Sequence, residues 1–368
     1  MQQAMSSTIS LDRTPASPFV AGAGVARPRV ADDKAMLKAA AELTRDLHAP
    51  KPAIYWADLI ASALVGYGAL AAAIHAAPGR WAVLAGIVAV FALYRAGSFI
   101  HEVSHMKHAA LPGFRGGWNA LVGVPLMIPS FMYEGVHNLH HAKTRYGTVE
   151  DPEYLPLALM KPWTVPVFVI VSALAPIGFL LRYTVLTPLS FLAPGLRKVV
   201  VERFSALAIN PQFRRRMPEG EAKALWDRVE IATSVWAVAL IAAVATGVVP
   251  LRSFGIFLAV VSATMVLNQV RTLVAHLWEN EGEPMSVTAQ YLDSVNVPPP
   301  TLLPALWAPV GLRYHALHHL LPGVPYHALG EAHRRITAVL EPGSPYHKAS
   351  YKGLPGLLGR LVGSTLKR

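Results

Sequence analysis

The sequence contains no cysteine, and only 15% of its 368 residues are charged. Without cysteine the chain can form no disulfide bond, Cys-ligated zinc site, Cys-ligated iron–sulfur cluster or thiolate-bound haem. Soluble domains usually carry about a quarter charged residues. The shortage of charge, together with a hydrophobic content of 53%, therefore indicates an integral membrane protein.

Acidic residues are also scarce, with 22 Asp and Glu against 33 Lys and Arg, which gives a formal net charge of +11. In a membrane protein this excess is typical of loops that face anionic lipid on the cytoplasmic side. The same rule places a basic segment at 197–228 in the cytoplasm. No basic region is interleaved with aromatic residues, so we expect no nucleic-acid partner.

We predict an all-α integral membrane protein with about four transmembrane helices, arranged as two hairpins, plus interfacial helices. A spanning helix needs about twenty apolar residues, and four stretches have that length: 54–76, 81–99, 229–249 and 253–275. No run of alternating polarity predicts a barrel. Two hairpins that cross out and back would return the chain to one face of the membrane.

Three segments leave alternatives open. Residues 35–48 have a helical apolar stripe, which fits a helix on the membrane surface or one packed on the core. Residues 117–133 are too short and too interrupted by proline for a clear span, and they fit an interfacial segment. Residues 163–194 contain four prolines and fit either two short helices or an interfacial hairpin.

The expected domain organisation is a disordered tail at 1–33, a membrane domain at 34–340 and a basic C-terminal tail at 341–368. The first segment is rich in Ser, Ala, Pro and Arg and has no apolar run of signal-peptide length. No long polar linker divides the apolar part of the chain, which predicts a single membrane domain.

Histidine is unevenly distributed, with eight of the fifteen in three windows of five residues. The windows are His101–His105 (HEVSH), His137–His141 (HNLHH) and His315–His319 (HALHH). Their spacings place imidazoles on one face of a helix, and neutral imidazole is a common metal ligand. Adjacent histidines are costly to bury without a partner. Eight imidazoles indicate two metal ions, and an all-nitrogen site suits iron, copper or zinc.

The order HxxxH, HxxHH, HxxHH around two hairpins resembles the membrane fatty-acid desaturases and related hydroxylases, from about residue 50 to residue 340. The segments 147–153 (GTVEDPE), 268–276 (NQVRTLVAH) and 315–327 are also similar to that family. The resemblance implies a centre of two iron ions, with O2 as co-substrate, that oxidises an unactivated C–H bond of a lipid acyl chain.

The resemblance favours desaturation, as in a fatty acid desaturase, with a lipid hydroxylase or related oxidase as the alternative. It also implies a separate electron donor, a ferredoxin or a cytochrome b5-like protein, because the chain has no His-Pro-Gly-Gly segment and no cysteine. The expected location is the bacterial inner membrane, with the metal site on the cytoplasmic side.

Carried over residue by residue, the resemblance assigns metal ligation to the eight histidines of the three windows, here called the first, second and third box. It also assigns a ninth histidine at the end of the last span, and it implies no catalytic residue beyond these ligands. The nine are His101, His105, His137, His140, His141, His276, His315, His318 and His319.

Other residues have two interpretations each. Asn268 fits a water-mediated metal contact or helix packing, and His108 fits a further ligand or a surface histidine. His327 and His333 are weaker ligand candidates. Asp151 and Glu150 fit carboxylates that orient ligand histidines, or a polar turn. The run Arg214–Arg216 fits a docking site for an acidic electron carrier, or charge that faces lipid.

Two other function classes compete with lipid oxidation. The first box also matches HExxH, in which Glu102 would be the general base of an intramembrane zinc metalloprotease; this explains two histidines and leaves six without a role. A transporter or metal carrier is the second alternative. It fits less well, because the expected spans are nearly free of charge and contain no inverted repeat.

Overall fold

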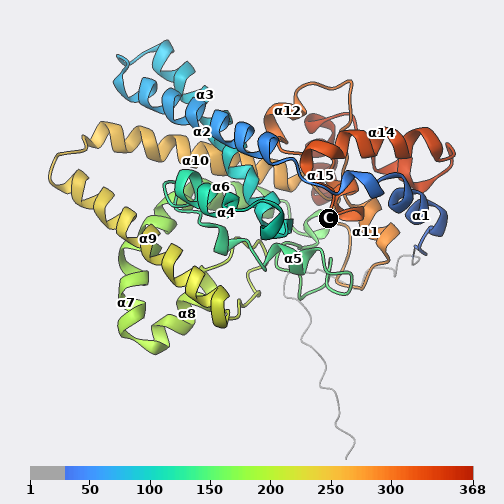
Figure 1. Cartoon of the computed structure of the whole chain (residues 1–368), viewed down its shortest axis with the longest axis horizontal. Coiled ribbons are helices and arrows are strands. Elements are labelled where there is room, and N and C mark those ends of the chain that lie inside the picture. The colour runs from blue at the N-terminus through green and yellow to red at the C-terminus, as the bar shows by residue number, and fades with distance from the viewer. Residues whose placement is uncertain (1–29, 368) are drawn as a thin grey trace, which may run out of the picture.

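A computed structural model describes residues 30–367, and this part of the chain is helical, with isolated β-bridges and no strands. The all-α prediction is therefore confirmed. In Figure 1 two long helical hairpins extend to one side, while the segment from α11 to α15 gathers at the other. The expected tail at 1–33 lies almost wholly outside the described residues.

Five helices are long and apolar enough to cross a membrane. The first hairpin is α2 (Pro52–His75) with α3 (Arg80–His105), and the second is α9 (Gly220–Ala245) with α10 (Leu251–Leu273). These match the four expected spans. The hairpin of α2 and α3 packs closely at Gly66, where an added Cβ would lie 2.6 Å from the Leu93 side chain. Small residues allow membrane helices to approach in this way.

The described residues contain five such helices, whereas the sequence predicted about four. The stretch for which the sequence left two arrangements open is one helical run, Thr164–Leu192, made of α6 (Thr164–Leu181), the π-helical turn η6 (Arg182–Leu186) and α7 (Thr187–Leu192). Its prolines do not end the helix. Pro176 lies inside α6 and Pro188 in the first turn of α7, where proline is tolerated.

Residues 106–163 connect the first hairpin to α6 through short helical turns. Trp118 in this segment is fully buried, and its indole donates to the carbonyl of Ala96 on α3. The segment expected at the interface is therefore packed against α3. Its elements are η2 (His108–Ala110), α4 (Phe114–Trp118), η3 (Asn119–Gly123), η4 (Ser130–Met132), α5 (His137–His140) and η5 (Leu157–Leu159).

The segment from α11 to α15 covers the histidine-bearing ends of the hairpins. Its elements are α11 (Val287–Asp293), α12 (Pro304–Trp307), α13 (His315–Leu320), η7 (Tyr326–Ala328), α14 (Leu329–Val339), η8 (Pro345–Ala349) and α15 (Leu354–Leu366). The segment expected as a C-terminal tail folds onto this unit, since Leu357 and Leu361 of α15 are buried in apolar clusters.

The N-terminal helix α1 (Lys34–Leu43) and the following turn η1 (Arg45–Leu47) pack on this same C-terminal unit. Met36 and Ala40 are buried in one cluster with Ile336 of α14. Of the two alternatives for 35–48, the structure therefore has the helix packed on the core.

A buried ion network joins the fifth helix to the second hairpin. Arg182 at the π-helical turn donates to Glu230 of α9 at 2.6 Å. Glu230 also accepts from Arg197 of α8 (Pro194–Phe204) at 2.7 Å and from the Trp226 indole at 2.8 Å. The Glu230 side chain is completely buried. One carboxylate thus holds three helical segments together.

We expect Glu230→Ala to destabilise the protein strongly, because it leaves two arginines without their carboxylate. Removing one partner of a buried ion pair costs about 3–5 kcal/mol, and the apparent melting temperature in detergent should fall. Glu221→Gln, at the exposed start of the same helix, should leave it unchanged. Equal melting temperatures for both variants would contradict the structural role of Glu230.

Candidate metal centre

The histidines of the three boxes come from the ends of separate helices. His101 and His105 lie in the last two turns of α3, and the second box forms α5 and the residue after it. The third box forms most of α13. All three meet at the end of the bundle where α10 also ends, which agrees with the two-hairpin topology.

His276 follows α10 by three residues and is placed by backbone pairing. An isolated antiparallel bridge joins it to Ser294. Leu277 N donates to Asp293 O at 2.7 Å, and Val295 N donates to Ala275 O at 3.0 Å. The next backbone bond, from Ala316 N to Val295 O at 3.1 Å, ties the third box to the same segment. His276 and α13 are therefore held in register with each other.

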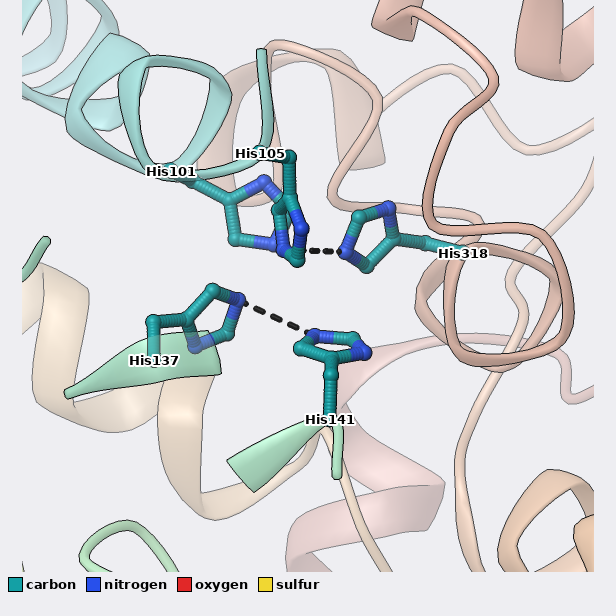
Figure 2. Close-up of side chains that lie close together, drawn as sticks. All are labelled: His101, His105, His137, His141 and His318. Atoms are coloured by element: carbon teal, nitrogen blue, oxygen red, sulfur yellow. Dashed lines mark hydrogen bonds between the residues drawn. The ribbon is translucent and has the colours of Figure 1, made fainter. Parts of the chain in front are cut away.

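All nine histidines expected from the sequence lie in two adjacent groups. In each group one ligand atom per residue can be chosen so that all lie within 4.8 Å of one another. Figure 2 shows that the five rings of the first group point toward a common centre, although they come from three separate segments. The first group contains His101, His105, His137, His141 and His318, and the second His140, His276, His315 and His319.

The Nε2 atoms face one another inside both groups. His318 Nε2 lies 3.0 Å from His105 Nε2, and His315 Nε2 lies 2.9 Å from His276 Nε2. The two groups adjoin, because the His141 and His319 rings stack with their centroids 4.2 Å apart.

The nitrogen atoms of the groups fit metal ions better than they fit one another. His276 Nε2 lies close to two other Nε2 atoms, at 2.9 Å and 3.3 Å, and a neutral imidazole has only one N–H. Both nitrogens of His101 and Nδ1 of His318 are buried without a hydrogen-bond partner. Leaving such atoms unpaired is costly, and a metal ion at the first centre would satisfy one nitrogen of His101.

Burial and the neighbouring histidines hold the pKa of six of these side chains well below the usual value. They are therefore neutral at physiological pH, which is the form that binds metal. The six are His137, His141, His276, His315, His318 and His319.

Carboxylates hold the outward nitrogens of the second box. Asp151 accepts from His140 Nδ1 at 2.9 Å and is itself fixed by the backbone N–H groups of Gly147 and Glu153, both at 2.8 Å. Burial lowers the pKa of His140, but the Asp151 carboxylate outweighs burial and raises it above the usual value. Such partners fix the tautomer and orientation of ligand histidines.

The sequence offered Asp151 and Glu150 as carboxylates that orient histidines. Asp151 contacts His140, whereas Glu150 is exposed and pairs with Arg145. Glu153 was not singled out. It contacts His137 Nδ1 at 2.8 Å and accepts from Tyr133 at 2.9 Å, and burial raises its pKa to about 7. Its place in the segment 147–153, which also contains Asp151, was the available signal.

The outward nitrogen of His276 faces a second polar network. Its Nδ1 lies 2.8 Å from the Tyr146 hydroxyl and 3.1 Å from Ser294 Oγ. Tyr146 also donates to Asp293 at 2.8 Å, and burial raises the pKa of that carboxyl to about 7. No motif marks this network, because Tyr146 lies 130 residues before His276 in the chain.

Arg271 is a further residue that sequence reasoning missed. Its Nη2 lies 3.0 Å from Nδ1 of His315. The side chain is buried, with 8% of the residue exposed. Arginine can only donate, so in this arrangement His315 Nδ1 is the acceptor.

Several other candidate residues lie outside both groups. His108 contacts Glu134 at 3.2 Å and Arg115 at 3.0 Å, while His327 accepts from Lys51 N. His333 contacts the Tyr346 hydroxyl at 2.9 Å. These three histidines have other partners.

Glu102, the glutamate of the HExxH reading, is also engaged elsewhere. It accepts from the Tyr55 hydroxyl and from Tyr326 N. A zinc-protease general base must reach a metal-bound water, so these contacts disfavour the metalloprotease alternative.

The three residues of the run Arg214–Arg216 differ in their exposure. Arg215 is half-buried, donates to the carbonyls of Ser205 and Glu134, and lies over the Trp226 ring. Arg214 and Arg216 are exposed, and both of their interpretations remain predictions.

A cavity of about 600 Å³ lies beside the histidines and is lined by residues of α3, α6 and α10. His137, His140, His276 and His315 form part of its wall. The remaining wall is mostly apolar and includes Leu93, Leu126, Ile128, Phe179 and Met265. Such a cavity suits a ligand with a long apolar chain. Asn268 lies in its wall and in neither histidine group.

Comparison with known proteins gives two findings. Residues 78–350 match the family described as "Fatty acid desaturase". The chain is also 50% identical over 333 residues to a protein of Caulobacter vibrioides (strain NA1000 / CB15N) named "Ceramide hydroxylase". This similarity covers 90% of the chain and 95% of that relative.

We expect Asp151→Asn to weaken metal binding by about 10- to 100-fold, the usual effect of losing a carboxylate behind a ligand histidine. Iron retained per chain after competition with a chelator measures the effect. Glu150→Gln, one residue away and exposed, is the matched control. Unchanged iron retention in Asp151→Asn would contradict the role given to this carboxylate.

Proposed function

The chain belongs to the fatty acid desaturase family, and within it we propose that this protein is a di-iron membrane hydroxylase that uses O2 to oxidise a ceramide-type lipid. The observation that supports the proposal most strongly is the pair of histidine groups beside an apolar cavity. It rests also on the name of the relative from Caulobacter.

The nine histidines would hold two metal ions, one in each group. We propose iron, because the family resemblance implies it and imidazole nitrogen suits it. Two bound irons with open positions would activate O2 and supply the oxidising power for a C–H bond. Asp151, Glu153 and Tyr146 would keep the ligand rings oriented, and the apolar cavity would keep bulk water away from the reacting carbon.

Hydroxylation is proposed ahead of desaturation, which reverses the order suggested by the sequence resemblance. Both reactions begin with removal of the same kind of hydrogen, so the boxes alone do not distinguish them. The relative that is similar over nearly the whole chain is named a hydroxylase, and this favours insertion of oxygen.

The electrons would come from a separate donor, a ferredoxin or a cytochrome b5-like protein. We place the histidine centre on the cytoplasmic side of a bacterial inner membrane. The basic loop with Arg214 and Arg216 lies at the same end of the bundle as the second box, since Ile209 N donates to the Pro152 carbonyl. The positive-inside rule puts such a loop in the cytoplasm.

Lipid analysis tests the proposed reaction. The protein is expressed with a donor system in a bacterium that makes ceramides but lacks its own ceramide hydroxylase, and the lipids are analysed by mass spectrometry. We expect ceramides that gain the mass of one oxygen atom. Loss of two hydrogen atoms would support desaturation instead, and no change in any lipid would contradict lipid oxidation.

His140→Ala should abolish the product and lower the iron content, because it removes a member of the four-histidine group. His108→Ala removes a histidine that lies outside both groups and should leave product and iron content unchanged. Metal analysis of the purified protein should find two irons per chain. One zinc per chain, with full activity in His140→Ala, would overturn the assignment.

A further inference from the structure

The cavity beside the histidine groups has few free polar atoms. Most hydroxyl groups in its wall are satisfied internally. Tyr94 donates to the carbonyl of Trp307, Ser98 to that of Tyr94, and Thr264 to that of Val260, while Tyr133 donates to Glu153. These groups have no donor left over for a ligand.

Arg271 is the exception nearest the histidines. Among the described residues, the ring of His315 is the one hydrogen-bond partner of its guanidinium, and no carboxylate pairs with it. Buried arginines normally pair with an anion or bind several acceptors. A buried guanidinium with five N–H donors and one contact therefore has donors available toward the cavity that it lines.

Gln269 provides a second free donor, two residues earlier on α10. It is 9% exposed and lines the cavity. Its carbonyl oxygen lies 3.2 Å from Oγ of Ser172 on α6, a hydroxyl that is also 2.9 Å from the Phe168 carbonyl, and its amide nitrogen is buried without a partner. An unsatisfied amide is costly inside a membrane protein, so a ligand acceptor at this place would be stabilising.

Metal binding by His315 would remove the acceptor that Arg271 contacts. If His315 binds a metal through Nε2, a neutral ring carries its hydrogen on Nδ1, and that hydrogen faces a guanidinium that can only donate. The guanidinium then needs another acceptor, and the cavity is the space that it faces.

From this arrangement we infer that Arg271 and Gln269 bind the carbonyl oxygen of the substrate's acyl group, and that oxidation therefore takes place within a few carbons of that carbonyl. The inference rests on the proposed hydroxylase function. Arg271 lines the cavity beside His315, Gln269 lines it two residues earlier on α10, and Phe179 and Met265 belong to its apolar part. The rest of the acyl chain extends along that part, away from the metal centre.

Binding without turnover tests the inference. The purified iron-loaded protein is kept under argon without reductant and titrated with labelled N-octanoyl sphinganine. The matched ligand is the uncharged ether analogue in which an O-octyl group replaces the N-octanoyl group, so that it has a chain of the same length but no carbonyl. Loss of a hydrogen bond to a charged donor costs about 10- to 100-fold in affinity. We expect Arg271→Gln to weaken the amide ligand in this way, and Gln269→Leu, which removes an uncharged donor, to weaken it by about 3- to 10-fold. Both variants should change the affinity of the ether ligand less than about twofold.

Arg252→Gln is the matched control, because Arg252 lies at the opposite end of α10 and donates to the carbonyls of Ile74 and Ala76. It should leave both affinities unchanged. Iron content is measured for each variant, and if Arg271→Gln loses iron, Gln269→Leu decides, because Gln269 contacts no histidine. Equal losses for both ligands in Gln269→Leu would overturn the inference.

The product gives an independent readout. In the wild-type protein, fragment masses should place the new oxygen within a few carbons of the amide carbonyl. An oxygen in the middle of the acyl chain would overturn the inference while leaving the hydroxylase function intact. Failure of the wild-type protein to oxidise any lipid would instead reject the proposed function.

Discussion

The burial of nine imidazoles in one place is the constraint on which the rest of the structure depends. A buried ring nitrogen needs a partner, and eighteen ring nitrogens are brought together here at the end of an apolar bundle. The inward and the outward ring nitrogens have different surroundings. Inward nitrogens face one another in two groups, and several outward nitrogens meet Asp151, Glu153, Tyr146 or Ser294. The loop after the second box supplies Asp151 and Glu153, and the bridge at His276 brings Ser294 to its ring.

The two groups differ in their relation to the cavity. Three members of the four-histidine group, His140, His276 and His315, line the cavity, whereas His137 is the one member of the five-histidine group that does so. The smaller group also has fewer ligands to offer. A metal there would have more room for a further ligand and would be the nearer of the two to a bound lipid. Five ligands would enclose the other site more completely.

The sequence predicted features that appear as local patterns, namely apolar runs and histidine spacings. It did not predict contacts between residues that are far apart in the chain. Box spacing and the apolar runs were enough to predict the two hairpins and eight of the nine histidines, and the family resemblance added His276. The fifth helix was missed because Pro176 and Pro188 suggested interruptions, while in the structure both are accommodated within one helical run. Asp293 and Arg271 could not be found from spacing, since their roles come from contacts with Tyr146 and His315, each far away in the chain. The helix at 35–48 had an apolar stripe, but its partner α14 lies almost three hundred residues later.

The backbone bridge between His276 and Ser294 has a consequence for how the protein is made. It aligns a residue at the end of the last long helix with the strand-like segment that also holds α13. The four-histidine group therefore cannot be complete before residue 319 has been synthesised, whereas the first hairpin and the second box end at residue 141. During synthesis His140 is in the chain before its partners His276, His315 and His319 have been added. A nascent chain that stalls before α13 has the histidines of the first two boxes and lacks His315, His318 and His319.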